Sequence, residues 1–244
     1  MLDEKIYDKL YQGYDKISSF AIWDFEMQKG KTHPVGGGMS YPTGDILIQE
    51  KSNLRSDRVI ISPNPSHEDA GDHDFSMHHA VYKKDREKAS PTGRNMRYAF
   101  YDSDFFYKEW YGAYLTDLFP NLGEVNFKVA QEKMSNASGH EKQFAALTDQ
   151  LELLASDSHL PSDETIKLMF TGARPQNKKY YQFLFDYKNY LLDHPELSPL
   201  LLQHKIELYG GYQFFYITGI PTTKNWDTEF QRALTLISTI DLKD

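Results

Sequence analysis

Residues 59–66 read VIISPNPS, an apolar stretch of strand length that runs into a polar turn containing two prolines. Three further stretches have the same form: GAYLTDLFP (112–120), TIKLMFTGARP (165–175) and FFYITGIPTTKNW (214–226). Each of the four precedes a segment able to form a helix. This alternation predicts an α/β fold, specifically a three-layer α/β/α sandwich around a mainly parallel, four-stranded central sheet.

The element boundaries follow from apolar periodicity. We expect the four strands at 59–63, 112–117, 165–170 and about 213–219, with shorter strands at 21–25 and 45–48. We expect helices at 2–18, 103–111, 140–156, 178–192 and about 226–239. Because no repeat or linker divides the chain, residues 1–244 are predicted to form a single domain, with 1–57 as an N-terminal helix and strand extension.

Composition narrows the class of protein. The 244 residues suffice for one sizeable core, and no apolar run approaches the ~20 residues that a membrane span needs. The charged N-terminal segment lacks the continuous apolar stretch of a signal peptide, so we expect a cytoplasmic protein without a membrane partner. The absence of cysteine excludes disulfides and thiolate metal sites. A net charge of −8 argues against broad nonspecific DNA affinity but allows a local basic patch.

The turn after the first strand is the first candidate site. Pro63 and Pro65 restrict the backbone around Asn64, so its amide is held in one geometry at the strand end. A fixed amide can position a water molecule or a sugar. An ordinary Asn-Pro turn is the alternative interpretation.

A second proline turn follows the fourth strand. Residues 219–226 read GIPTTKNW, with two hydroxyls and one cation ahead of a predicted helix. Free backbone N–H groups at such a position favour an anion such as phosphate. Arg174, where the third strand meets its helix, is also placed to hold a phosphate or a carboxylate. A solvated loop is the competing interpretation.

Two such turns at parallel strand ends resemble the uracil-DNA glycosylase superfamily, and within it the mismatch-specific thymine/uracil branch. The first loop of that branch reads G-I-N-P-G, and its Asn and Pro match Asn64 and Pro65. Its second loop has Met-Pro-Ser-Ser, where this chain has residues 220–223, IPTT. The resemblance covers roughly residues 58–240 in strand order, and few residues match by motif.

The resemblance implies a hydrolase that flips a nucleobase out of DNA and cleaves its N-glycosidic bond, as in DNA repair. Asn64 would position the attacking water, and His67 would lie near the pocket. Pro65, Ser66, Asp117 and Phe75 would contact the base, with Phe75 stacking on it; core packing is the alternative for Phe75. The residues that would bind DNA are Pro221, Thr222, Thr223, Lys224, Asn225 and Arg174. No metal or organic cofactor is implied, and the oligomeric state stays open.

The chain also departs from the family pattern. Ser62 and Ser66 stand where glycines are common, and Ile220 stands where some members have a histidine. No large apolar residue follows Thr223 to act as a wedge. Asp117 replaces an asparagine that reads the uracil edge. An ionised carboxylate only accepts hydrogen bonds and would favour an amino-bearing base, although Asp117 can also be a buried acid or a helix cap.

Two other functions stay open. The departures above, together with the acidic net charge, favour a noncatalytic module that binds a nucleobase or nucleic acid on the same fold. A metal-dependent hydrolase is the other alternative, because potential ligands crowd one polar stretch. They are His67, Glu68, Asp69, Asp72, His73, Asp74, His78 and His79. These residues lack a fixed ligand spacing and a helical H-E-x-x-H pattern, and a solvated polar loop is the alternative interpretation.

Overall fold

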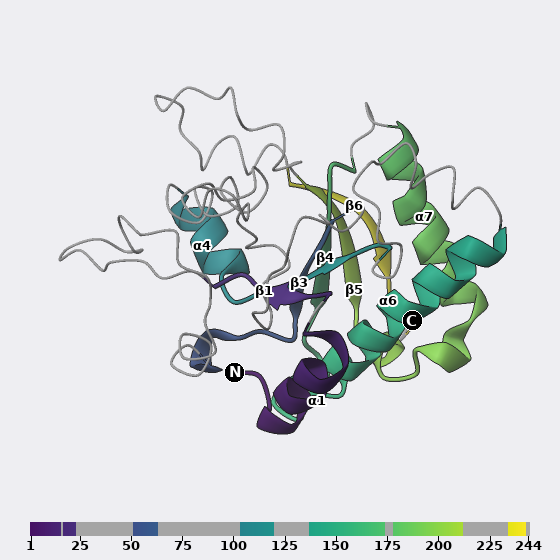
Figure 1. The fold of residues 1–244 in the computed structure, drawn as a ribbon. Coiled ribbons are helices and arrows are strands. Elements are labelled where there is room, and N and C mark those ends of the chain that lie inside the picture. The colour runs from purple at the N-terminus through teal and green to yellow at the C-terminus, as the bar shows by residue number, and fades with distance from the viewer. Residues whose placement is uncertain are drawn as a thin grey trace, which may run out of the picture.

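The computed structural model describes residues 1–15, 17–22, 51–62, 103–119, 137–173, 178–211 and 234–242. All of the strands in these ranges join one mixed sheet of six strands, ordered β1-β3-β2-β4-β5-β6 (Figure 1). The strands are β1 (Ser19–Phe20), β2 (Arg58–Ser62), β3 (Tyr114–Asp117), β4 (Ile166–Thr171), β5 (Ile206–Gly211) and β6 (Thr235–Ile240). The chain is therefore an α/β protein, as the alternating pattern predicts.

Helices and short helical turns connect these strands. The α-helices are α1 (Glu4–Tyr14), α4 (Asp104–Trp110), α6 (Ala137–Ala155) and α7 (Lys178–Asp193). The 3-10 turns are η1 (Lys51–Asn53), η3 (Pro195–Leu197) and η4 (Leu201–Gln203). The helices expected at 103–111, 140–156 and 178–192 are confirmed to within three residues at each end. The first helix is shorter than expected, because it ends at Tyr14 rather than at residue 18.

The centre of the sheet is parallel and its edges are antiparallel. Strands β3, β2, β4 and β5 are parallel neighbours, whereas β1 pairs antiparallel with β3 and β6 pairs antiparallel with β5. The expectation of a four-stranded sheet was thus wrong about the strand number and about the edges. The strands expected near 59–63, 112–117 and 165–170 are confirmed as β2, β3 and β4.

Two expectations near the C-terminus need correction. The fourth parallel strand is Ile206–Gly211, ahead of the expected 213–219, which lies outside the described residues. The helix expected at 226–239 is wrong over 235–239, because Thr235–Ile240 is the edge strand β6, and residues 226–233 lie outside the described residues. The sequence TLISTI is rich in β-branched residues, which favour a pleated surface, and pairing with β5 satisfies its backbone. Near the N-terminus, β1 occupies 19–20, and residues 21–22 of the expected strand are not in a strand; residues 23–25 and 45–48 lie outside the described ranges.

Both faces of the sheet carry an apolar cluster. Val59, Ile61 and Leu168 point into the larger one, which α1, α6 and α7 cover. Ile60, Leu115 and Met169 point to the other face, where they pack with Phe106 and Trp110 of α4. The alternation is the period of two of a β-strand, and burial on both faces makes the five residues of β2 continuously buried. Figure 1 shows α4 on one side of the strands and α6 and α7 on the other.

Side-chain caps start two of these helices. Asp3 accepts a hydrogen bond from the Lys5 N–H at the start of α1, and Ser103 accepts one from the Phe106 N–H at the start of α4. Both satisfy N–H groups that the helix leaves without a partner. No helix in the described ranges has both the length and the apolar character that crossing a membrane requires.

Candidate functional site

The carboxyl edge of the sheet carries three polar side chains in one row. Ser62, Asp117 and Thr171 are the last residues of β2, β3 and β4. In each strand the residue two positions earlier belongs to the apolar cluster under α4, so the three side chains also face the α4 side. Ser62 pairs directly with Asp117, and the exposed fractions are 7% for Ser62, 0% for Asp117 and 5% for Thr171. We call these residues the carboxyl-edge row.

Asp117 has the most unusual environment of the row. Desolvation by burial raises the pKa of its carboxyl group well above the usual value, because a charge is poorly solvated there. The protonated group has an O–H donor as well as acceptor oxygens. The burial agrees with the alternative that Asp117 is a buried acid, and not with an ionised carboxylate that only accepts hydrogen bonds.

The chain leaving β4 turns tightly against β5. Gly172 has a φ of 80°, a left-handed conformation that favours glycine, and its N–H donates to the Gly211 carbonyl at 3.1 Å. A Cβ on Gly210 would collide with the carbonyl oxygen of Ala173. Glycine at position 210 therefore allows this close approach. The turn delivers the chain to the same edge as the carboxyl-edge row, one residue before Arg174.

A buried amide fixes β3 from the opposite face. The Gln150 side-chain oxygen, on α6, accepts hydrogen bonds from the Tyr114 hydroxyl at 2.9 Å and from the Thr116 hydroxyl at 2.8 Å. Its amide nitrogen donates to the Ala146 carbonyl at 3.0 Å. This network holds the strand that ends in Asp117. Its polar groups bond one another, so we assign it a positioning role.

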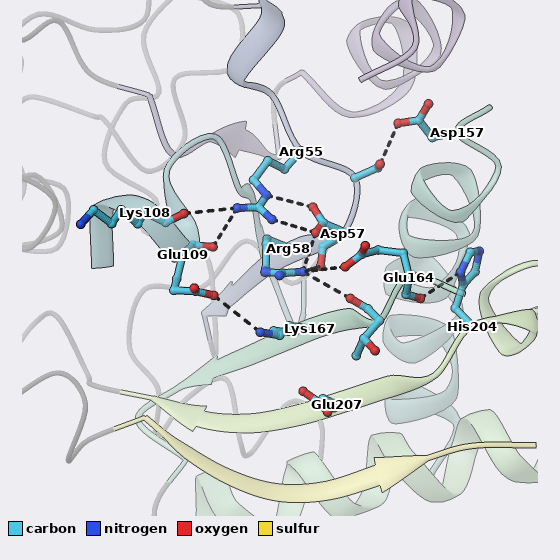
Figure 2. Close-up of polar contacts among 12 residues, drawn as sticks. Arg55, Asp57, Arg58, Lys108, Glu109, Asp157, Glu164, Lys167, His204 and Glu207 are labelled. Atoms are coloured by element: carbon cyan, nitrogen blue, oxygen red, sulfur yellow. Dashed lines mark hydrogen bonds and ion pairs between the residues drawn. The ribbon is translucent and has the colours of Figure 1, made fainter. Parts of the chain in front are cut away.

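The opposite, amino edge of the sheet holds a network of paired charges (Figure 2). The Arg55 guanidinium donates to both carboxylate oxygens of Asp57, at 2.9 and 2.8 Å, and Arg58 donates to the same carboxylate at 2.5 Å. Arg55 also donates to the carbonyl of Glu109, at 3.2 Å, in the last turn of α4. Burial opposes ionisation of Asp57, but the hydrogen bond from Arg55 and the charges of Arg58 and Arg55 outweigh it and lower the Asp57 pKa.

A cavity of about 460 Å³ lies beside this network. It is lined by Met1, Ser52, Asn53, Leu54, Arg55, Ser56, Asp57, Tyr107, Lys108, Tyr111, His159, Leu160, Pro161 and Glu164. Arg55 and Asp57 already bond each other, and Arg55 caps the end of α4 as a cation does favourably at a helix C-terminus. We therefore assign the amino edge a structural role and take the carboxyl edge as the candidate site.

Within the described residues, one group could hold a metal ion: the ligand atoms of Asp3, Asp157 and His159 all lie within 4.8 Å of one another. Hydrogen bonds already account for this closeness. Asp157 accepts from the Asp3 N–H at 3.2 Å, from the Ser56 hydroxyl at 2.7 Å and from the His159 N–H at 3.0 Å. Asp3 in turn caps α1. The group ties the start of α1 to the residues that follow α6.

The structure describes one of the residues predicted for the site, Asp117. The others lie outside the described residues: Asn64, Pro65, Ser66, His67, Phe75, Arg174, Pro221, Thr222, Thr223, Lys224 and Asn225. The potential metal ligands at 67–79 lie outside them as well. Sequence reasoning did not find that Ser62 and Thr171 share a row with Asp117. The sequence does show a polar residue at the end of each apolar strand. That these residues form one row, however, depends on which strands are neighbours, and the sequence does not give this order.

Comparisons with protein families, with curated proteins and with solved structures found no match to this chain.

Proposed function

We propose that the chain is a uracil-DNA glycosylase-like protein that hydrolyses the N-glycosidic bond of a nucleobase flipped out of DNA. We further propose that the sheet with its helices forms the three-layer α/β/α sandwich of that superfamily. The support is the sequence resemblance together with the position of one strand. Asn64 lies two residues beyond the end of β2, and β2 occupies a special place in the sheet.

The position of β2 is the observation that carries the proposal. From β2 the chain adds β3 on one side, then crosses to add β4 on the other side of β2. In open parallel sheets, ligands bind outside the carboxyl ends of the strands at such a switch point. The segment that contains Asn64 therefore starts at the place where a sheet of this topology binds its ligand, next to Asp117.

Each residue of the proposed site has a chemical task. Asn64 orients the water that attacks the sugar carbon, and His67 lies near the pocket. Phe75 stacks on the flipped base, while the turn at 221–225 and Arg174 bind backbone phosphates, which position DNA without reading its sequence. Oriented protein dipoles stabilise the oxocarbenium-like sugar and the departing base. The reaction needs no metal.

The burial of Asp117 supports an imide-bearing base as the substrate. Uracil and thymine present a carbonyl acceptor beside an N3–H donor. A neutral carboxyl group can donate to the carbonyl and accept from N3–H, whereas an ionised group can only accept. Because burial raises the Asp117 pKa, we propose that this residue reads a uracil-type edge rather than an amino-bearing one.

A noncatalytic binding module on the same fold is the second candidate. Ile220 stands where family members that stabilise the leaving base have a histidine, and no apolar wedge follows Thr223. A protein with these two changes could still bind a base in its pocket, but it lacks the histidine that stabilises the leaving base and the apolar residue that fills the vacated stack.

Base release from oligonucleotides tests the proposal. The substrates are single-stranded and duplex DNA with uracil, thymine mismatches, hypoxanthine or alkylated bases, assayed with a chelator present. We expect release of free base, and Asn64→Ala should lower the single-turnover rate by about 100-fold or more, as loss of a water-positioning group does. The matched control is Asn189→Ala, which removes an exposed amide from α7 and should leave the rate unchanged.

The remaining outcomes separate the candidate functions. Saturable, salt-sensitive DNA binding without product would support the binding module over the glycosylase. Activity that appears only after chelator is removed and metal is added would contradict the proposal and support a metal-dependent hydrolase.

A further inference from the structure

Strand β6 gives the sheet an edge that is well suited to pairing. It is the last strand in the sheet order, so one side pairs with β5, and no described strand pairs with its other side. Its six residues, TLISTI, include no charge and no proline. Thr235, Leu236 and Thr239 are exposed, Leu236 to 49%.

The other edge of the sheet is built differently. Strand β1 has two residues, Ser19 and Phe20, and both are buried. Proteins protect sheet edges with very short strands, with charged side chains, with prolines or with β-bulges that twist the edge away. The edge at β1 uses a short strand, whereas β6 is long enough for a ladder of backbone hydrogen bonds and has neither a charge nor a proline. An edge of this kind is a template for another strand.

We propose that the chain forms a two-fold symmetric homodimer in which β6 pairs antiparallel with β6 of a second copy, so that the two sheets become one continuous sheet. Antiparallel pairing of a strand with itself is the isologous contact that closes a dimer. Among the described strands, each copy offers one edge of this kind. The assembly therefore stops at two chains and does not grow into a filament.

The charge pattern of β6 favours a second copy. Like charges placed opposite each other destabilise a strand pair, and an uncharged strand avoids this in every self-pairing register. The first charged residue beyond the strand is Asp241. In an antiparallel pair centred on β6, the two Asp241 side chains lie at opposite ends of the ladder. The charge of Asp241 is thus kept away from the same residue of the second copy.

The shape of β6 favours the same partner. The register with β5 shifts between Leu208 and Tyr209, which leaves Ile237 as an extra residue on β6. Such a bulge bends a strand and increases its twist, which disfavours pairing with a flat strand. A second copy has the same bulge and twist, and its strand is already ordered. A flexible peptide would have to lose its backbone freedom on pairing.

The mass of the full-length chain in solution tests the dimer. Sedimentation equilibrium should give twice the mass of one chain at micromolar concentration. Leu236→Lys and Thr239→Lys each place two like charges at the contact and should raise the dimer dissociation constant by about 100-fold. Thr239→Val keeps the position uncharged, and Gln12→Lys places the same charge on the exposed side of α1. Both controls should remain dimeric.

Single cysteines give a second readout that does not depend on the lysine variants. The natural chain has no cysteine, so one introduced at position 235, 236 or 239 is unique. In a pair centred on β6, position 236 of one copy lies opposite position 239 of the other. Oxidation of an equimolar mixture of Leu236→Cys and Thr239→Cys should therefore link two copies, and Gln12→Cys should stay unlinked. A monomer at all concentrations would overturn the proposal. A dimer that survives both lysine substitutions and forms no link through β6 would overturn it as well.

Discussion

Two aspartates in this domain show how local surroundings set protonation. Asp57, beside the amino edge, is held ionised by Arg55 and Arg58 although burial opposes its charge, so its pKa is lowered. Asp117, at the carboxyl edge, is fully buried, and desolvation raises its pKa. The sequence identified Asp117 as a candidate from its position after an apolar run. A buried acid was one of the interpretations that the sequence allowed for Asp117, but the sequence could not decide between them, because burial depends on helix α4 and on the neighbouring strand β2.

The raised pKa of Asp117 predicts a specific pH dependence of stability. The folded pKa lies above the unfolded value of about 3.9, so above that pH the unfolded state ionises while the folded state stays protonated. The wild type then loses about 1.4 kcal/mol of unfolding free energy for each pKa unit of the difference. Asp117→Asn removes this loss, so the variant should gain stability relative to the wild type between pH 4 and pH 7.

Urea unfolding at pH 4 and pH 7 measures this gain. The control is Asp193→Asn, which removes an exposed carboxylate at the end of α7. An Asp117→Asn variant whose stability differs from that of the wild type by the same amount at both pH values would show that the carboxyl group is not held neutral.

At the scale of elements, Gly112 joins three segments between α4 and β3. Its N–H donates to the Ala21 carbonyl at 3.0 Å, and its own carbonyl accepts from the Arg55 N–H at 2.9 Å. Its φ of 78° lies in the left-handed region. A Cβ there would collide with the backbone carbonyl of Asn53. Both the conformation and the space therefore require glycine.

Two glycine substitutions should act in opposite directions. Gly112→Ala should destabilise the fold by about 2 kcal/mol or more, since the strained conformation alone costs about 1–3 kcal/mol and a backbone contact is added. Gly13→Ala lies inside α1, where an added Cβ would meet no other atom within 4 Å, and should stabilise by roughly 0.5–1 kcal/mol. Thermal unfolding compares them. A Gly112→Ala variant as stable as the wild type would contradict this account of the turn.

The success of prediction from sequence differed from element to element. The apolar run 59–61 and the periodicity of 140–156 each point to one structure, and β2 and α6 confirm them. Strand β5 was missed because Glu207 and the glycine pair at 210–211 interrupt its apolar pattern. For β6, apolar spacings of three and four suggested a helix. Pairing with a distant strand decided both cases, and spacing along the chain does not encode that pairing.

At the scale of the whole molecule, the strand order creates the candidate site. Ser62 and Asp117 are far apart in sequence, yet the parallel register places them opposite each other. The α/β class followed from the sequence because helices and strands alternate. The antiparallel edges and the carboxyl-edge row did not follow, because they depend on which strands become neighbours. The functional proposal relies on this same edge: β2 and β5 both end there, and the proline-containing stretches 62–66 and 219–225 follow them in sequence.

The central claim is that the turns at 62–66 and 219–225 flank one cleft, and a distance measured between them tests it most directly. The natural chain has no cysteine, so a double variant with Ser66→Cys and Lys224→Cys carries spin labels at these two positions alone. Diluting the labelled chain with unlabelled chain removes the distances between labels on different copies. The account predicts a separation below about 25 Å. The full diameter expected for a domain of this length is about 45 Å, from the usual scaling of the radius of gyration. A separation close to that diameter would place the turns on opposite sides and contradict the account.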